Sequence, residues 1–139
     1  MSSANGRQDL SALGVQDLSA LGIQALVDPG KTPTDEQVRV IEAPRRPLLV
    51  VAGAGSGKTE TMSMRVLWLV ANHEDIAPSS VLGLTFTRKA AGELGDRLRQ
   101  RLALLAGRVP SLREGLDEDP VSLTYNSFAE RIVAEHGMR

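Results

Sequence analysis

A glycine-rich run that ends in lysine and threonine is the part of the chain best suited to chemistry. The run follows Ala52 and reads Gly53-Ala54-Gly55-Ser56-Gly57-Lys58-Thr59. It matches the spacing G-x-x-x-x-G-K-[ST] when Ala52 takes the place of the first glycine. Glycines allow backbone N–H groups to converge on phosphate oxygens that side chains would otherwise block. All residues from Ala52 to Thr59 are therefore predicted to bind a nucleotide.

Two side chains of this run are predicted to have separate roles in phosphate chemistry. Lys58 is expected to neutralise the β- and γ-phosphates, and the Thr59 hydroxyl is expected to bind Mg²⁺. These two are accordingly the predicted catalytic residues, with Thr59 as the metal ligand. A glycine-rich turn that serves packing alone is the alternative, but lysine and threonine directly after the last glycine favour phosphate binding.

A phosphate loop needs a strand before it and a helix after it, and the sequence predicts both. Leu48 to Ala52 is a fully apolar run of strand length, typical of a parallel strand that is buried on both faces. From Lys58 to Val70, apolar residues recur at helical spacing. The N-terminus of that helix is expected to attract the same phosphate through its partial positive charge.

The rest of the sequence predicts further alternation of helices and strands. Short helices are expected from Thr34 to before Pro44 and over residues 127–135, the latter capped by Asn126 or Ser127. A long helix from Arg88 carries an apolar stripe, and strands are expected at residues 81–86 and 121–125, with a loop at 107–120. This order predicts an α/β fold with a parallel sheet and flanking helices.

Residues 1–32 are predicted to form a flexible leader of short, frayed helical turns that ends in a turn at Asp28-Pro29-Gly30. The heptapeptide Gln-Asp-Leu-Ser-Ala-Leu-Gly occurs in it twice, at residues 8–14 and 16–22. Two copies are too few and too short for a solenoid. A tolerated duplication in a mobile terminus is the simpler interpretation, and a docking peptide that places leucines in a partner's groove is the alternative.

Composition excludes several kinds of site. The chain has no cysteine, which excludes disulfides, thiolate metal sites and cysteine catalysis. It shows neither a signal-peptide pattern nor an apolar run of about 20 residues, so we expect a cytoplasmic location and no membrane partner. The net charge of −1 neither requires nor excludes a polyanionic partner, because local patches decide such binding.

Four blocks of sequence resemble, in order and spacing, the UvrD/Rep-type superfamily 1 DNA helicases. The blocks are similar to the Q motif, motif I, motif Ia and the Thr-aromatic-His-Ser-Phe block of that family, and they lie at residues 34–37, 52–59, 84–91 and 124–128. The chain is most similar to the actinobacterial branch, which includes AdnAB-type helicase-nuclease subunits. The resemblance implies that residues 33–139 are the N-terminal part of a P-loop NTPase (RecA-like) ATP-binding domain, and that this domain is incomplete.

The resemblance also implies an adenine contact. Gln37 of the Q-motif block would read the base of ATP with its amide. The spacing Thr34-x-x-Gln37 is equally that of a capping box, in which Gln37 reaches back to the backbone N–H of Thr34. Both interpretations stay open on the sequence alone.

Two blocks would contact single-stranded DNA by the same resemblance. In the first, Thr85, Thr87 and Lys89 would contact phosphates, with Phe86 near a base or packed beneath the sheet. In the second, Thr124, Tyr125 and Asn126 would lie on the DNA side, with Tyr125 either a stacking platform or a half-buried strand residue. The arginines of the long helix are interpreted as a solvated face; they are Arg97, Arg99 and Arg101.

The sequence departs from the family at two positions and lacks two expected features. Asn126 replaces the usual histidine, and Glu60 replaces an arginine that assists the nucleotide in many relatives. Hydrolysis needs an acidic pair on a strand and a charge-stabilising arginine. Neither is identifiable, and the acidic residues 117–119 are interpreted as a solvated loop.

The implied function is the ATP-binding portion of an ATP-dependent 3′-to-5′ DNA helicase that uses ATP and Mg²⁺. Its partners would be single-stranded DNA and the remaining helicase domains, and the chain alone should be a poor ATPase. A nucleotide- or partner-binding fragment without turnover is the main alternative. A small P-loop phosphotransferase is a third.

Overall fold

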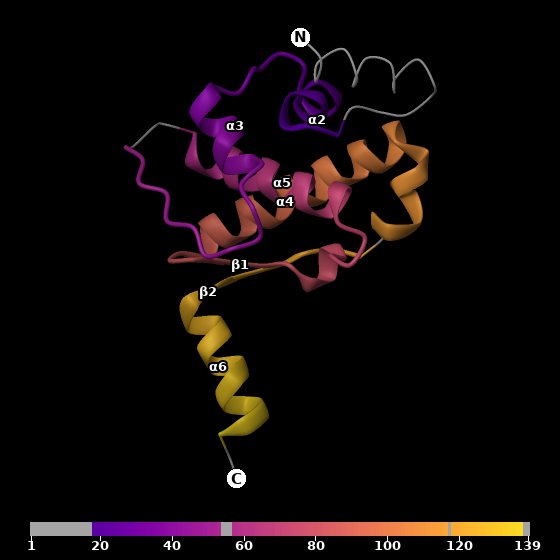
Figure 1. The fold of residues 1–139 in the computed structure, drawn as a ribbon. Coiled ribbons are helices and arrows are strands. Elements are labelled where there is room, and N and C mark those ends of the chain that lie inside the picture. The colour runs from indigo at the N-terminus through magenta and orange to yellow at the C-terminus, as the bar shows by residue number, and fades with distance from the viewer. Residues whose placement is uncertain (1–17, 54–56, 117, 138–139) are drawn as a thin grey trace.

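The computed structural model describes residues 18–53, 57–116 and 118–137 (Figure 1). In this part of the chain, most helices lie on one side of a two-stranded parallel sheet (Figure 1), so the α/β class is confirmed. The elements are α2 (Ala20–Val27), α3 (Asp35–Ile41), α4 (Lys58–Asn72), η1 (Pro78–Ser80), β1 (Leu82–Thr85), α5 (Arg88–Arg108), η2 (Pro110–Leu116), β2 (Val121–Thr124) and α6 (Tyr125–His136).

The sheet consists of β1 and β2, which α5 connects. The strands pair in parallel, from Leu82 opposite Val121 to Thr85 opposite Thr124. Helix α5 packs closely on them, since a Cβ at Gly83 would lie 2.9 Å from Cδ2 of Leu94. Both strands therefore end at the same edge of the sheet, where Thr85 and Thr124 lead into α5 and α6.

The strand predicted at Leu48 to Ala52 is not formed, and this prediction was wrong. The segment belongs to no strand, and Leu49 and Val51 are 86% and 88% exposed. An apolar strand that is buried on both faces needs paired strands at its edges and helices above and below. Within the described residues, β1 and β2 pair with each other and not with this segment.

The core lies between α4 and α5. Met64 and Leu67 of α4 are buried against Leu102 and Leu105 of α5, and Ile41 of α3 closes one side. The predicted stripe of α5 is confirmed, because all of its members are buried: Ala91, Leu94, Leu98, Leu102 and Leu105. Helix α4 thus carries the end of the phosphate loop on a well-packed element.

Helix α2 also belongs to this core, so the prediction of frayed turns was wrong for Ala20–Val27. Ala20 and Ile23 are completely buried, and Ser19 caps the helix by accepting from the N–H of Gly22 at 3.1 Å. The N–H of Ala20 donates to Oε2 of Glu42 at 2.7 Å. Apolar residues three to four positions apart give this helix a buried face. Residues 1–17, with the first heptapeptide copy, lie outside the described part.

The remaining elements differ from the predictions in detail. The turn after α2 is confirmed, since the N–H of Lys31 donates to the carbonyl of Asp28 at 3.2 Å. Part of the predicted loop at residues 107–120 is the 3₁₀ helix η2. Helix α6 has no buried residue and extends away from the other elements (Figure 1). No helix among the described residues is both long and apolar enough to cross a bilayer.

Candidate functional site

Helix α4 begins at the predicted phosphate loop. Its N-cap is Gly57, with φ 78° and ψ 30°, a left-handed conformation that glycine adopts without steric cost. Among the described residues no side chain caps the helix, and the N–H groups of its first turn lack intrahelical partners. Lys58 and Thr59 are exposed at this end. The predicted residues Ala54, Gly55 and Ser56 lie outside the described part of the chain.

Gln37 makes the predicted capping box and also faces the phosphate loop. Its Oε1 accepts from the N–H of Thr34 at 2.9 Å, and its own N–H donates to Oγ1 of Thr34 at 3.2 Å. A Cβ at Gly57 would lie 3.1 Å from Nε2 of Gln37. The capping interpretation is confirmed, and the adenine contact stays a prediction for the amide nitrogen that faces Gly57.

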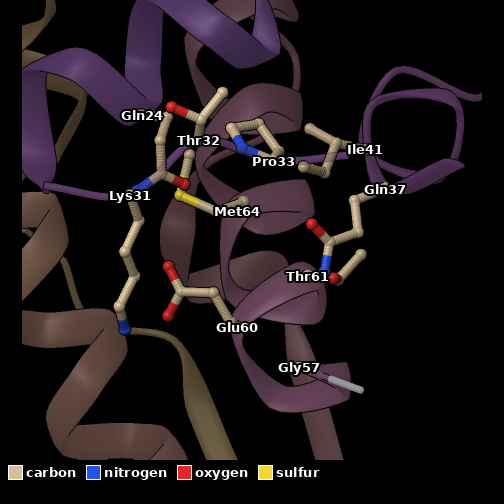
Figure 2. Close-up of a pocket in the computed structure, with 10 residues that line it drawn as sticks. All are labelled: Gln24, Lys31, Thr32, Pro33, Gln37, Ile41, Gly57, Glu60, Thr61 and Met64. Atoms are coloured by element: carbon tan, nitrogen blue, oxygen red, sulfur yellow. The ribbon is translucent and has the colours of Figure 1, made fainter. Parts of the chain in front are cut away.

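Two cavities meet at Gln37 and Thr61. The first, of about 380 Å³, is shown in Figure 2, where the Gln37 amide is turned toward Thr61 and the leader closes the opposite side through Gln24 and Lys31. The second, of about 350 Å³, is lined by Lys58 and other polar residues on one part and by apolar residues on the rest: Val40, Val50, Val51, Ala52 and Met62. Both volumes fall within the range of small-molecule sites.

Arg65 joins the two helices that carry these residues. Its Nη1 donates to the carbonyls of Val40 at 3.0 Å, Ile41 at 3.2 Å and Ala43 at 2.9 Å. Its Nη2 donates to the carbonyl of Pro44 at 3.2 Å. Burial lowers the pKa of Arg65, although an arginine stays protonated in proteins. The sequence does not point to this residue, since an arginine on a helix does not reveal which carbonyls it will reach.

Glu60 turns away from the loop and pairs with α5. Its carboxylate lies 3.1 Å from Nη1 of Arg97 and also pairs with Arg101, whose Nη2 is 3.6 Å from Oδ2 of Asp28. The Arg101 side chain is only 11% exposed. The prediction of a solvated face was therefore wrong for Arg101, because Glu60 and Asp28 hold its side chain against the adjacent helices, whereas Arg97 pairs with Glu60 and is still 39% exposed. It holds for Arg99, which pairs with Asp96 one turn away.

An exposed aromatic pair lies beyond the ends of the two strands. The rings of Phe86 and Tyr125 have centroids 5.0 Å apart and planes tilted by 35°. Phe86 is 89% exposed, so the alternative that placed it beneath the sheet was wrong. Lys89 and Asn126 are exposed beside them. The structure thus brings residues of both predicted DNA-binding blocks to one edge of the sheet.

The threonine hydroxyls at this edge make hydrogen bonds to the protein backbone. The Thr85 hydroxyl donates to the carbonyl of Thr87 at 3.1 Å, and Oγ1 of Thr87 caps α5 by accepting from the N–H of Ala90. Thr124 is buried and caps α6 by accepting from the N–H of Ser127 at 3.1 Å. The cap of α6 is therefore Thr124, and the prediction of Asn126 or Ser127 was wrong, because the helix begins at Tyr125.

Comparison with known proteins gives a consistent match. Residues 33–139 match the UvrD/REP helicase N-terminal domain family. The chain is 44% identical to DNA helicase II of Escherichia coli over 104 residues, which are 75% of this chain and 13% of that protein. Over 65 residues, 47% of the chain, it is 49% identical to the ATP-dependent DNA helicase UvrD2 of Mycobacterium tuberculosis and 42% identical to the ATP-dependent DNA helicase PcrA of Staphylococcus aureus, covering 9% of each.

Proposed function

The chain belongs to the UvrD/REP helicase N-terminal domain family, and from this premise we propose that it supplies part of the ATP-binding domain of an ATP-dependent DNA helicase. Its α/β elements would then belong to a RecA-like P-loop NTPase fold, with residues 33–139 as the N-terminal part of that domain and residues 1–32 as a leader. The chain spans 13% or less of the length of the three relatives described above. Translocation and strand separation are thus proposed for a longer protein.

The observation that carries the proposal is the start of α4 beside Gln37. A left-handed Gly57 and a helix N-terminus that no described side chain caps suit a bound triphosphate. Lys58, exposed at the same end, would neutralise the β- and γ-phosphates, and Thr59 would hold Mg²⁺. The residues present therefore fit ATP and Mg²⁺. When bound, the metal would offset the charge on the phosphate oxygens.

Base recognition would fall to Gln37. Its Oε1 is oriented by the Thr34 N–H, so its Nε2 is turned toward Gly57 and the cavity of about 380 Å³. An amide nitrogen in this position can donate to a ring nitrogen of adenine. The capping box would thus orient the side chain that reads the base.

Titration with a fluorescent ATP analogue and Mg²⁺ tests the nucleotide site. Lys58→Ala should weaken binding at least about tenfold, a loss of about 1.4 kcal/mol, because it removes a charge-assisted contact to phosphate. Gln37→Ala should reduce the preference for ATP over GTP. Lys89→Ala is the control, because this exposed lysine pairs with Glu93 one turn along α5 and lines neither of the two cavities. Absence of ATP binding by the unaltered chain would contradict the proposal.

DNA binding is proposed for the edge that carries Phe86 and Tyr125. Exposed aromatic rings next to a lysine and hydroxyl groups suit single-stranded DNA, whose bases stack while its phosphates meet polar groups. Phe86→Ala should weaken binding of an oligothymidylate about tenfold, since one base–aromatic stack contributes about 1–3 kcal/mol. Leu104→Ala, which removes an exposed apolar side chain from α5, serves as the control. Equal losses in both variants would rule out a specific stacking role.

DNA dependence separates the helicase function from the two alternatives. We expect slow phosphate release from ATP by this chain alone, and any stimulation should come from single-stranded DNA. A phosphotransferase would instead transfer phosphate to a small acceptor without DNA. A nucleotide-binding fragment would bind ATP and release no phosphate under either condition.

A further inference from the structure

We propose that Arg65 is a positioning residue for base recognition: it fixes helix α3 on α4, so that Gln37 faces the phosphate loop. This inference rests on the nucleotide site proposed above. Arg65 lies outside every motif that the sequence analysis identified.

Arg65 supplies hydrogen bonds at the C-terminal end of α3, where the carbonyl of Val40 also accepts from the N–H of Ala43 at 3.3 Å. The last carbonyls of a helix lack intrahelical partners. Arg65 donates to the carbonyls of Val40, Ile41 and Ala43 at 2.9–3.2 Å, with a fourth bond to Pro44 at 3.2 Å. A cation at a helix C-terminus also interacts favourably with the helix dipole. One guanidinium thus satisfies several backbone groups at once.

Apolar packing alone holds α3 weakly. The helix has seven residues, too few to be stable in isolation, and Ile41 is its one buried residue. Arg65, by contrast, projects from α4, a helix of 15 residues with five buried positions. The hydrogen bonds of Arg65 therefore connect a short, lightly packed helix to a long, well-packed one.

The angle of α3 determines where Gln37 lies. At 1.5 Å per residue, Gln37 is about 6 Å along the helix axis from Ile41, so a tilt of about 10° at the C-terminus would move it by about 1 Å. Nε2 of Gln37 is already within 3.1 Å of the position of a Cβ on Gly57. A shift of this size would change a hydrogen bond to the base while leaving in place the residues of α4 that are proposed to bind phosphate.

The test measures base preference separately from phosphate binding. Arg65→Met should lower the ratio of the GTP Kd to the ATP Kd by about tenfold, toward one. Binding of inorganic tripolyphosphate should change less than about twofold, because the N-terminus of α4 is unaltered. Arg65→Lys keeps the charge but loses the guanidinium fork, and should give an intermediate ratio. Arg45→Met is the matched control, because Arg45 makes an exposed pair with Asp75.

A double-mutant cycle shows whether Arg65 acts through Gln37. The double variant Gln37→Ala with Arg65→Met should have the same base preference as Gln37→Ala alone. The inference is overturned if the two losses add, or if Arg65→Met lowers the melting temperature without changing the ratio. If Arg65→Met does not fold, the ratio for Arg65→Lys decides.

A wrong assignment of the nucleotide site would give a different result from a wrong assignment of Arg65. If Lys58→Ala binds ATP as well as the unaltered chain does, the nucleotide site itself is wrong, and the inference falls with it. If Lys58→Ala abolishes ATP binding and Arg65→Met leaves the base preference unchanged, only the positioning role of Arg65 is overturned.

Discussion

Gly57 meets two constraints at one backbone position. Its φ of 78° lies in the left-handed region, and a Cβ there would come within 3.1 Å of the Gln37 amide. Gly57→Ala should therefore lower the free energy of unfolding by about 1–2 kcal/mol, the cost of this conformation for an L-residue. It should also weaken ATP binding, because relief of the contact displaces Gln37.

Denaturant unfolding and nucleotide titration of the same variant check this prediction. Gly107→Ala is the control, since its Cβ would meet no atom within 4 Å and its helix should gain up to about 1 kcal/mol. A Gly57→Ala variant as stable as the unaltered chain would show that the left-handed conformation is not required.

At the level of single residues, the sequence correctly predicted side chains whose roles depend on residues nearby in the chain. The capping box of Thr34 and Gln37 and the exposed Lys58 at a helix start follow from local spacing. The contacts of Arg65 and Arg101 did not, because their partners lie more than 20 positions away in the chain. Long side chains reach whatever the fold brings near, and one sequence does not show what that is.

At the level of elements, Glu60 and its two arginines hold α4 against α5. Glu60→Gln should lower the free energy of unfolding by about 2 kcal/mol, because it leaves the largely buried Arg101 with a weaker set of partners. Asp96→Asn removes a carboxylate from the exposed pair with Arg99 and should change stability by less than about 1 kcal/mol. Urea unfolding of both variants measures the difference. Equal effects would mean that the Glu60 pairs are no stronger than surface pairs.

The strands predicted at residues 81–86 and 121–125 are formed as β1 and β2, and the elements that were mispredicted failed for physical reasons. The stripe of α5 is a local pattern, and any compact fold buries it. The run from Leu48 to Ala52 has the composition of a buried strand, but a strand exists only when another backbone pairs with it. For α2 the prediction underestimated the structure. Its sequence resembles a mobile repeat, yet the helix forms and Ile23 is buried in the core.

For the whole molecule, the same apolar run is an exposed apolar surface. Leu49 and Val51 are more than four-fifths exposed, and exposed apolar side chains favour association with other chains. The double substitution Leu49→Lys with Val51→Lys should therefore reduce self-association of the isolated chain. Sedimentation at increasing protein concentration measures it, with Leu104→Lys as a control on α5. An unaltered chain that stays monomeric throughout would contradict the expectation.

The packing of α2 determines how the loss of one heptapeptide copy would affect stability. Loss of residues 8–15 or of residues 16–23 leaves one copy of the heptapeptide, followed by one residue and then Gln24. That one residue is Ile23 in the first product and Val15 in the second, and the two products are otherwise identical. Because the side chain at position 23 is fully buried, the valine version should be less stable by only about 0.5–1.5 kcal/mol. Loss of either copy would thus preserve most of the sequence that starts this core helix.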